Sequence, residues 1–273
     1  MNLSDLAELS RKVRLDIIDL AYRCEGPAHI GGALSIVEIL VSLYGTIMQH
    51  NPKDPQWENR DRFILSKGHG VLAFYSALHQ CGYFSRDKLL TFKEDGSDLI
   101  AHPVMNLELG IESSNGSLGN GLSMAVGMAW ALNLKGIDSQ VFTLVGDGEC
   151  DEGSIWEAAM SASRLHLHNL TAIVDCNGFQ SDGPVQEDSL PQSLDKKWKS
   201  FGWATQIVDG HSIEDLLTTI QHSYRVRTGK PKVVIAKTIK GAGIKFMENN
   251  NVWHHNRLTK SSYELARNEL MGD

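Results

Sequence analysis

Residues 140–153 read QVFTLVGDGECDEG, and this stretch decides the fold. Its first part, Gln140–Val145, is an apolar run that predicts a buried β-strand, and Gly146-Asp147-Gly148 follows where that strand ends. One predicted helix then leads to a second apolar strand, Leu170–Asp175, which is followed by Asn177. This spacing is about that of a right-handed crossover between parallel strands. The stretch therefore predicts two strands of a parallel sheet with polar residues at their carboxyl ends.

The rest of the chain repeats the alternation of strands and helices, which is typical of a doubly wound, mostly parallel α/β sheet flanked by helices. The other strands are expected at Arg62–Ser66, Ala204–Val208 and Lys232–Lys237. Helices are expected at residues 3–24 with Ser4 as N-cap, at 35–48, from 71 to 81, and at 117–134, 154–165, 194–201, 213–226 and 262–270. Residues 84–116 show little continuous periodicity and are expected to be rich in loops.

Length and composition exclude several classes of protein. The chain has 273 residues, 42% of them hydrophobic, which predicts a single domain over residues 1–273 with an N-terminal helix and a C-terminal extension from about residue 243. A net charge of −7 argues against a general nucleic-acid binder, and no apolar run is long enough to cross a membrane. The N-terminus lacks the apolar core of a signal peptide, and the four cysteines lack the spacing of a disulfide framework or zinc site. We therefore expect a cytoplasmic protein with reduced thiols.

The polar residues at the two strand ends predict a site for a cation and a phosphate group. In open α/β sheets, ligands bind outside the carboxyl ends of the strands, so Asp147 and Asn177 are expected to reach one ion if their strands are neighbours. Mg²⁺ prefers such oxygen donors and takes few of them from protein when phosphates supply the rest, although Ca²⁺ or Mn²⁺ would also fit. Gly146 and Gly148 allow backbone to approach a phosphate closely. The alternative, in which Gly-Asp-Gly is only a turn after a strand, remains open on these residues alone.

Gly146-Asp147-Gly148 followed by Asp175-Cys176-Asn177 resembles the thiamine diphosphate motif of enzymes that bind this cofactor. Other stretches resemble the transketolase family over roughly residues 10–260, in the same order: His29-Ile30-Gly31-Gly32, RDRFILSKGH at 60–69, Ala101-His102-Pro103, Gly116-Ser117-Leu118-Gly119 and GECDEG at 148–153. The resemblance implies transfer of a two-carbon ketol unit from a ketose or ketose phosphate to an aldose or aldose phosphate.

The family binds thiamine diphosphate between two domains, and this chain resembles only the domain that holds the diphosphate and the metal. The resemblance therefore implies the N-terminal subunit of a split transketolase. A C-terminal subunit would carry the pyrimidine domain with its activating glutamate, in an α2β2 assembly. The physiological sugars cannot be read from the sequence, and the pathway could be central, such as the pentose phosphate pathway, or specialised.

The resemblance also assigns roles to individual residues. The metal ligands would be Asp147, Asn177 and the backbone carbonyl of Phe179. The cofactor-binding residues would be His69, Gly116, Leu118, Gly146, Asp147, Gly148, Glu149, Asn177 and His254. The catalytic residues would be His29, His69, His102, His254 and Glu152. Histidine suits this reaction because a group that titrates near neutral pH can donate and accept protons at sugar hydroxyls in alternate half-reactions.

One local feature departs from the family pattern, and the remaining histidines have no assigned role. Pro27-Ala28 stands where the family more usually has a Ser-Gly type pair, which leaves the backbone before His29 and the acceptor selectivity open. The other histidines, among them His255, are expected to be structural or exposed, and His211 in Asp209-Gly210-His211 is expected to lie in a turn or a subunit contact.

Three other functions are weighed against that of a transketolase. The first is the α subunit of a 2-oxo acid dehydrogenase, which also binds the diphosphate in a split arrangement. The second is a nicotinamide dinucleotide-binding domain, but the G-x-G-x-x-G pattern lacks its third glycine, because Gly153 comes too late. The third is a regulatory subunit without catalysis, against which the retention of Asp147 and Asn177 argues.

Overall fold

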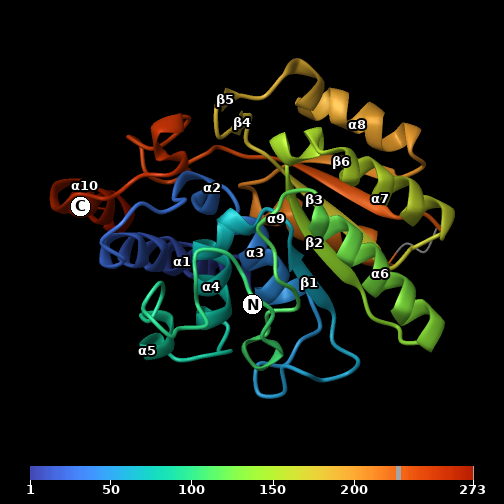
Figure 1. Ribbon diagram of the computed structural model, residues 1–273, viewed down its shortest axis with the longest axis horizontal. Coiled ribbons are helices and arrows are strands. Elements are labelled where there is room, and N and C mark those ends of the chain that lie inside the picture. Colours follow the sequence, from blue (N-terminus) through green and yellow to red (C-terminus); the bar gives the residue numbers. More distant parts are fainter. Residues whose placement is uncertain (226–228, 273) are drawn as a thin grey trace.

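A twisted sheet of five parallel strands forms the centre of the molecule (Figure 1). The computed structural model describes residues 1–225 and 229–272. The strands follow the spatial order β1-β2-β3-β7-β6. Their bounds are β1 Arg62–Leu65, β2 Val141–Gly146, β3 Leu170–Cys176, β6 Ala204–Asp209 and β7 Lys232–Lys237. The predicted fold class, a parallel α/β sheet flanked by helices, is confirmed.

Helices cover both faces of this sheet, and a short hairpin stands beyond its carboxyl edge (Figure 1). The longer helices are α1 Leu3–Arg23, α4 Val71–Gln80, α6 Asn120–Lys135, α7 Gly153–Arg164, α8 Pro191–Ser200, α9 Ile213–Arg225 and α10 Lys260–Met271. The shorter ones are α2 Gly31–Leu34, α3 Val37–Ser42 and α5 Arg86–Leu89. The hairpin pairs β4, Phe179–Gln180, with β5, Gly183–Pro184.

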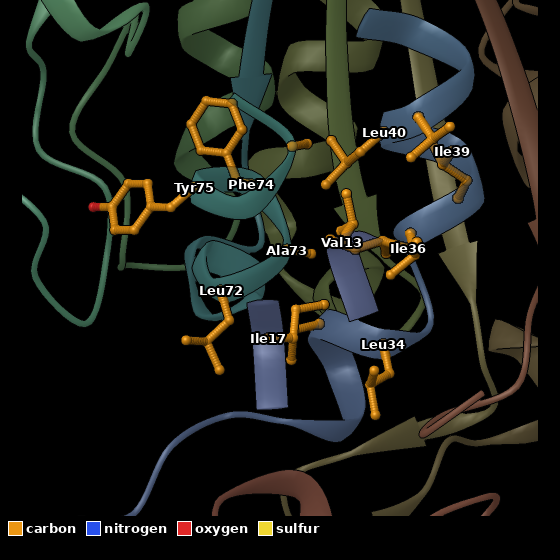
Figure 2. Close-up of a cluster of buried hydrophobic side chains, with 14 of the residues drawn as sticks. Val13, Ile17, Leu34, Ile36, Ile39, Leu40, Leu72, Ala73, Phe74 and Tyr75 are labelled. Carbon is orange, nitrogen blue, oxygen red and sulfur yellow. The ribbon is translucent and has the colours of Figure 1, made fainter. Parts of the chain in front are cut away.

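The core lies in two layers, one on each side of the sheet. Side chains alternate along a strand, so Phe142 and Leu144 of β2 face one layer while Val141 and Val145 face the other. The first layer packs against α1, α3 and α4, where Val13 and its neighbours form a buried cluster (Figure 2). The second layer packs against α6, α7 and α8. Burial on both faces explains why the central strands β2 and β3 read as nearly continuous apolar runs.

The pairing of β2 with β3 decides where the polar residues lie. The two strands are parallel, and their register sets Gly146 beside Asp175. Asp147 therefore follows β2 at the edge of the sheet where Asn177 follows β3. The crossover between the two strands is α7, as the sequence predicted.

Several predicted element bounds are wrong, each for a local reason. The helix expected at 35–48 is α3 followed by a π-helical turn, Leu43–Ile47, and the short helix α2 before it was not predicted. The N-cap of α1 is Asn2 rather than Ser4, because Asn2 and Asp5 form a reciprocal capping box. Helix α6 begins at Asn120 because Gly119 takes the left-handed conformation with φ +82°.

Other differences are smaller. Helix α8 begins at Pro191, three residues before the expected start, since proline suits the first turn of a helix. The segment 84–116 contains α5 and a 3₁₀ turn, Leu107–Leu109. The expected end of a helix at residue 226 lies outside the described residues. Within the described parts of the chain, no helix has the length and apolar character needed to cross a membrane.

We predict that Gly121→Ala destabilises the chain by about 1–3 kcal/mol, the usual range for overpacking. A Cβ at Gly121 would lie 2.6 Å from the Cα of Ser66, which is backbone at the end of β1. Gly127 of the same helix is the matched control, because its Cβ would meet nothing within 4 Å. Gly127→Ala should stabilise by about 0.5–1 kcal/mol. Urea unfolding of both variants measures the difference, and equal effects would contradict the proposed close contact.

Candidate functional site

A cavity of about 440 Å³ opens at the carboxyl ends of the strands. It is lined by every residue to which the sequence assigned a role: His29, His69, His102, Gly116, Leu118, Gly146, Asp147, Gly148, Glu149, Glu152, Asn177, Phe179 and His254. It is also lined by residues without a predicted role: Lys67, Asp151, Gln180, Ser181 and Asp182. The fold therefore gathers in one place residues that lie far apart in the sequence, from His29 to His254.

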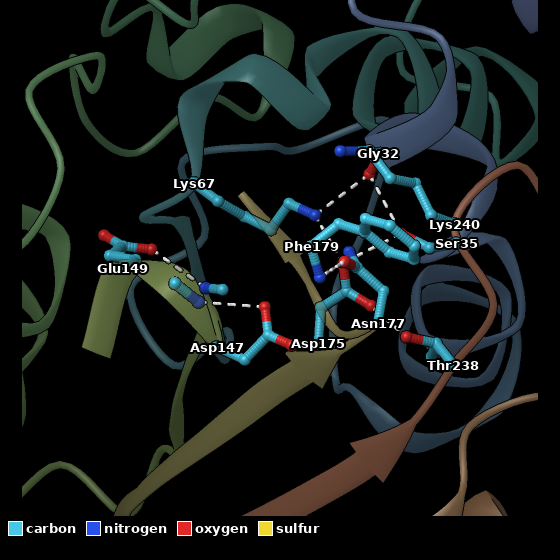
Figure 3. A network of polar contacts seen from close by, with 12 residues as sticks. Gly32, Ser35, Lys67, Asp147, Glu149, Asp175, Asn177, Phe179, Thr238 and Lys240 are labelled. Atoms are coloured by element: carbon cyan, nitrogen blue, oxygen red, sulfur yellow. Dashed lines mark hydrogen bonds and ion pairs between the residues drawn. The ribbon is translucent and has the colours of Figure 1, made fainter. Parts of the chain in front are cut away.

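Asp147 and Asn177 both line this cavity, and both lie beside Asp175 (Figure 3). The carboxylate of Asp147 accepts hydrogen bonds from the backbone N–H groups of Gly148, at 2.9 Å, and Gly178, at 2.6 Å. The amide nitrogen of Asn177 donates to Asp175 at 2.8 Å, and its oxygen accepts from the N–H of Phe179 at 3.0 Å. These bonds fix which end of the Asn177 amide is oxygen.

Asp175 is the buried centre of the network beside them (Figure 3). It is 0% exposed and forms an ion pair with Lys67. The hydroxyls of Ser35 and Thr238 also donate to it. Burial by itself would raise the pKa of Asp175, but Lys67 and the hydroxyl donors outweigh burial and lower that pKa. Asp175 therefore stays ionised and holds Asn177 in place.

The carboxylate of Asp147, unlike that of Asp175, has backbone N–H groups as its hydrogen-bond donors. It is 1% exposed, and burial, with the negative charge of Asp175 nearby, raises its pKa to about 7. A bound cation would keep this carboxylate ionised, so the site fits a positive ion. In the described part of the chain, no three His, Cys, Asp or Glu side chains are arranged to hold a metal. A cation here would need the oxygens of Asn177, the backbone of Phe179 and a ligand, a hard donor set that suits Mg²⁺.

The glycines and Glu149 shape the floor of the cavity. A Cβ at Gly148 would lie 2.9 Å from the Cβ of Gln180, so only glycine fits this turn without a shift. Glu149 is buried, and its carboxylate accepts from the N–H groups of Gly119, at 2.9 Å, and Gly146, at 3.0 Å, and from the hydroxyl of Ser66. Glu149 thus ties the start of α6 to the ends of β1 and β2. Its place in the cavity is as predicted, but its oxygens already have donors within the protein.

The predicted histidines gather around His29. Its ring centroid lies 5.5 Å from that of His69, 5.8 Å from that of His102 and 5.4 Å from that of His254. The structure adds His255, whose ring lies 4.3 Å from that of His29. No sequence pattern pointed to His255. Its position follows from an antiparallel bridge between Ala28 and Asn256, which sets residues 29 and 255 opposite each other.

The imidazoles of His29, His69, His102 and His254 are neutral at neutral pH, because each pKa lies below the near-neutral range expected from the sequence. Burial, followed by the neighbouring histidines, lowers the pKa of His29 to about 3. Burial and the charge of Lys240 lower the pKa of His254 to about 4. Burial also lowers the pKa of His69 well below its ordinary value, and lowers that of His102. Each neutral ring offers one N–H donor and one nitrogen acceptor to a ligand with hydroxyl groups.

Sequence reasoning missed Lys240. Its ammonium donates to Asn251 at 2.6 Å and contacts Nδ1 of His254 at 2.8 Å. Burial and the nearby Lys67 lower the pKa of Lys240 to about 8. Its position shortly after β7, before Gly241, is the signal that could have drawn attention to it, since residues after strand ends form this site.

Comparisons with known proteins give one consistent family. The family described as "Transketolase, thiamine diphosphate binding domain" matches residues 4–272. The chain is 40% identical over 270 residues to a 6-deoxy-6-sulfo-D-fructose transketolase subunit of Clostridium sp. (strain MSTE9), covering 99% of this chain and 96% of that one. It is 39% identical to an apulose-4-phosphate transketolase subunit of Phocaeicola vulgatus, covering 99% and 95%.

Longer transketolases match over part of their length. Human transketolase is 35% identical over 98% of this chain and 42% of its own. The crystal structure of transketolase from Campylobacter jejuni superposes with a TM-score of 0.87 at 30% identity, covering 99% of this chain and 43% of that one. The chain therefore spans about two fifths of these longer proteins and nearly all of the two relatives whose names call them subunits.

We predict that the metal-free chain loses stability between about pH 4 and pH 7 because of Asp147. An acid whose pKa is raised on folding stabilises the folded state only while it is protonated. Its contribution is therefore complete below the ordinary pKa of 3.8 and is lost as the pH rises through about 7. The side chain in Asp147→Asn does not titrate. This variant should therefore lack the pH-dependent part of the unfolding free energy that Asp147 contributes.

The measurement is the difference in unfolding free energy between wild type and Asp147→Asn as a function of pH, with metal chelated. The difference should change by a few kcal/mol, since each pKa unit corresponds to about 1.4 kcal/mol. A difference that stays constant from pH 4 to pH 8 would show that Asp147 ionises normally without a cation.

Proposed function

The chain belongs to the transketolase family, and from this premise we propose that it transfers a two-carbon ketol unit from a ketose donor to an aldose acceptor together with a partner subunit. One observation carries the proposal: the cavity at the carboxyl edge of the sheet joins Asp147 and Asn177 to a cluster of neutral histidines. The first feature suits a cation with a diphosphate, and the second suits a sugar. The α subunit of a 2-oxo acid dehydrogenase is not favoured, because the relatives named above are transketolases.

Thiamine diphosphate would occupy this cavity with a Mg²⁺ ion, for which Ca²⁺ or Mn²⁺ could substitute. Asp147, Asn177 and the carbonyl of Phe179 would hold the ion. Gly148 and Gly116, which bring backbone to the cavity wall, would contact the diphosphate together with Gly146, Glu149 and His69. Leu118 would lie beside the pyrimidine. When bound, the cofactor supplies the means to cleave and re-form a carbon–carbon bond next to a carbonyl.

The histidines of this chain would orient the sugar and move its protons. The ammonium group of Lys240 can only donate, so it donates a hydrogen bond to Nδ1 of His254. The neutral His254 ring therefore carries its proton on Nε2, from which it can donate to a sugar oxygen. His29, His69 and His102 would accept and return protons at substrate hydroxyls, since each neutral imidazole has one nitrogen acceptor and one N–H donor.

We propose that the pyrimidine domain is carried by a separate C-terminal transketolase subunit, in an α2β2 assembly. The names and lengths of the two subunit relatives support this arrangement. Exposed apolar side chains on α6 support it too, since Met124, Trp130 and Leu134 are 40%, 47% and 70% exposed. Helix α6 begins next to the cavity, and Glu152, which is exposed at its rim, would meet the partner near the activating glutamate.

The setting and the substrates are proposals as well. Residues 1–273 would form one domain with an extension from about residue 243, acting in the cytoplasm. The substrates would be sugars or sugar phosphates, either of the pentose phosphate pathway or of a specialised route. The names of the two subunit relatives point to sugars that carry an acidic group, a sulfonate in one case and a phosphate in the other.

Reconstitution tests the proposed function. The chain and its partner subunit, purified separately, are combined with thiamine diphosphate and Mg²⁺ and screened with ketose donors and aldose acceptors. We expect little ketol transfer from this chain alone, transfer from the pair, and none from the pair when the chain carries Asp147→Ala. Full activity of the chain alone would refute the split arrangement. A pair that binds the cofactor but transfers no ketol unit would refute the assigned reaction.

We predict that His102→Ala lowers kcat of the reconstituted pair about 10²-fold or more, the usual effect of losing a general acid–base group. The affinity for thiamine diphosphate should change little, because the His102 ring lies beside His29 in the histidine cluster and is not among the residues proposed to hold the ion or the diphosphate. His222→Ala, at an exposed position on α9, is the matched control and should leave both quantities as in wild type. Unchanged turnover in His102→Ala would assign this histidine to structure alone.

A further inference from the structure

The three residues after β7 do not line the cavity, but two of them contact residues that line or support it. The hydroxyl of Thr238 donates to Asp175, and Lys240 contacts His254 through Nζ, while Ile239 lies between them. This segment is neither helix nor strand, so no regular ladder fixes it. Its position must come from contacts with other parts of the chain.

The motif Asp209-Gly210-His211, which begins at the last residue of the edge strand β6, makes several of those contacts. Others are backbone hydrogen bonds, from the N–H of Thr238 to the carbonyl of Cys176 and from the N–H of Gly241 to that of Gly31. The N–H of Gly210 donates to the carbonyl of Lys237 at 2.7 Å. A Cβ at Gly210 would lie 2.4 Å from Cγ2 of Thr238 and 2.9 Å from the oxygen of Lys237. Glycine is therefore required for the two segments to pass this closely, and the motif does more than turn the chain.

The His211 side chain joins the same segment to the helical layer. Its Nδ1 lies 2.9 Å from a carboxylate oxygen of Glu38, and the N–H of Ile239 donates to its Nε2 at 2.8 Å. A carboxylate can only accept, so Nδ1 carries the proton and Nε2 is the acceptor. The two bonds together select one tautomer of a neutral imidazole.

Glu38 is itself held firmly. It forms a buried, two-point ion pair with Arg14 of α1, and the Nε of Arg14 donates to the carbonyl of Ala242 at 3.0 Å. Burial would raise the pKa of Glu38, but His211 and Arg14 outweigh burial and lower it to about 2. Arg14, Glu38 and His211 thus form a chain of hydrogen-bonded side chains. It contacts the backbone after β7 at residues 239 and 242.

We propose that His211 is a positioning residue of the cofactor site: by accepting the hydrogen bond from Ile239 it holds Thr238 against Asp175 and Lys240 against His254. This role rests on the proposed function, because it assumes that the cavity binds thiamine diphosphate. His211 does not line the cavity itself and touches neither the sugar nor the cofactor. It acts through the backbone of one residue.

Two substitutions separate the two bonds of His211. The side-chain amide of asparagine lies two bonds beyond Cβ, as Nδ1 does, so His211→Asn can keep the contact with Glu38 but cannot reach Ile239. The amide of glutamine lies three bonds beyond Cβ, as Nε2 does, so His211→Gln can offer its oxygen to the N–H of Ile239. His222→Asn, at an exposed position on α9, is the matched control.

The experiment measures two quantities in these variants: the affinity of the reconstituted pair for thiamine diphosphate with Mg²⁺, and the amide hydrogen exchange of Ile239 in the full chain. We expect His211→Asn to weaken cofactor binding about ten-fold, as for the loss of one hydrogen bond, and to speed exchange at Ile239. His211→Gln should restore both quantities to near the wild-type values, and His222→Asn should change neither.

Equal affinity and equal exchange in His211→Asn and His211→Gln would overturn the proposal, because a purely structural role would not depend on which bond is kept. If the wild-type pair does not bind thiamine diphosphate at all, the proposed function fails separately. In that case the exchange at Ile239 still decides whether His211 holds this segment. Slow exchange at Ile239 in both His211→Asn and His211→Gln would overturn the positioning role of His211.

Discussion

The parallel pairing of β2 with β3, in the register that sets Gly146 beside Asp175, is the constraint on which the rest of the site depends. It brings Asp147 and Asn177, which are well separated in the sequence, to one edge of the sheet. A slip of one residue would turn every side chain of a strand to the opposite face. The apolar layers on both faces of the sheet prevent such a slip, so the core and the site are specified by the same contacts.

The two buried carboxylates at this edge, Asp175 and Asp147, are neutralised to different degrees. We propose that the weaker neutralisation of Asp147 lets the site bind a cation. Asp175 has Lys67 and two hydroxyls, and it remains ionised while it holds the amide of Asn177. Asp147 accepts from two backbone donors, and burial raises its pKa to about 7. Isolated buried charge is costly, so a bound cation with a phosphate ligand would complete this arrangement. The histidines that line the same cavity stay neutral and offer hydrogen bonds instead of charge.

Features that depend on neighbours in the sequence could be predicted, and features that depend on distant contacts could not. Apolar runs and the spacing from Asp147 to Asn177 were enough to predict the sheet and the place of the cavity. Nothing in the sequence links His255 to His29 or Glu38 to His211, because these pairs meet only through the packing of separate elements. Helix α2 escaped prediction as well, since this short segment is buried all round and carries no helical periodicity of burial.

The most direct test of the central claim is a crystal structure of the assembled complex with thiamine diphosphate and Mn²⁺, in which anomalous scattering locates the ion. We expect one ion in each copy of this chain, bound by the carboxylate of Asp147, the carboxamide oxygen of Asn177 and the diphosphate. An ion held elsewhere, or a diphosphate bound with these two side chains turned away from it, would contradict the claim.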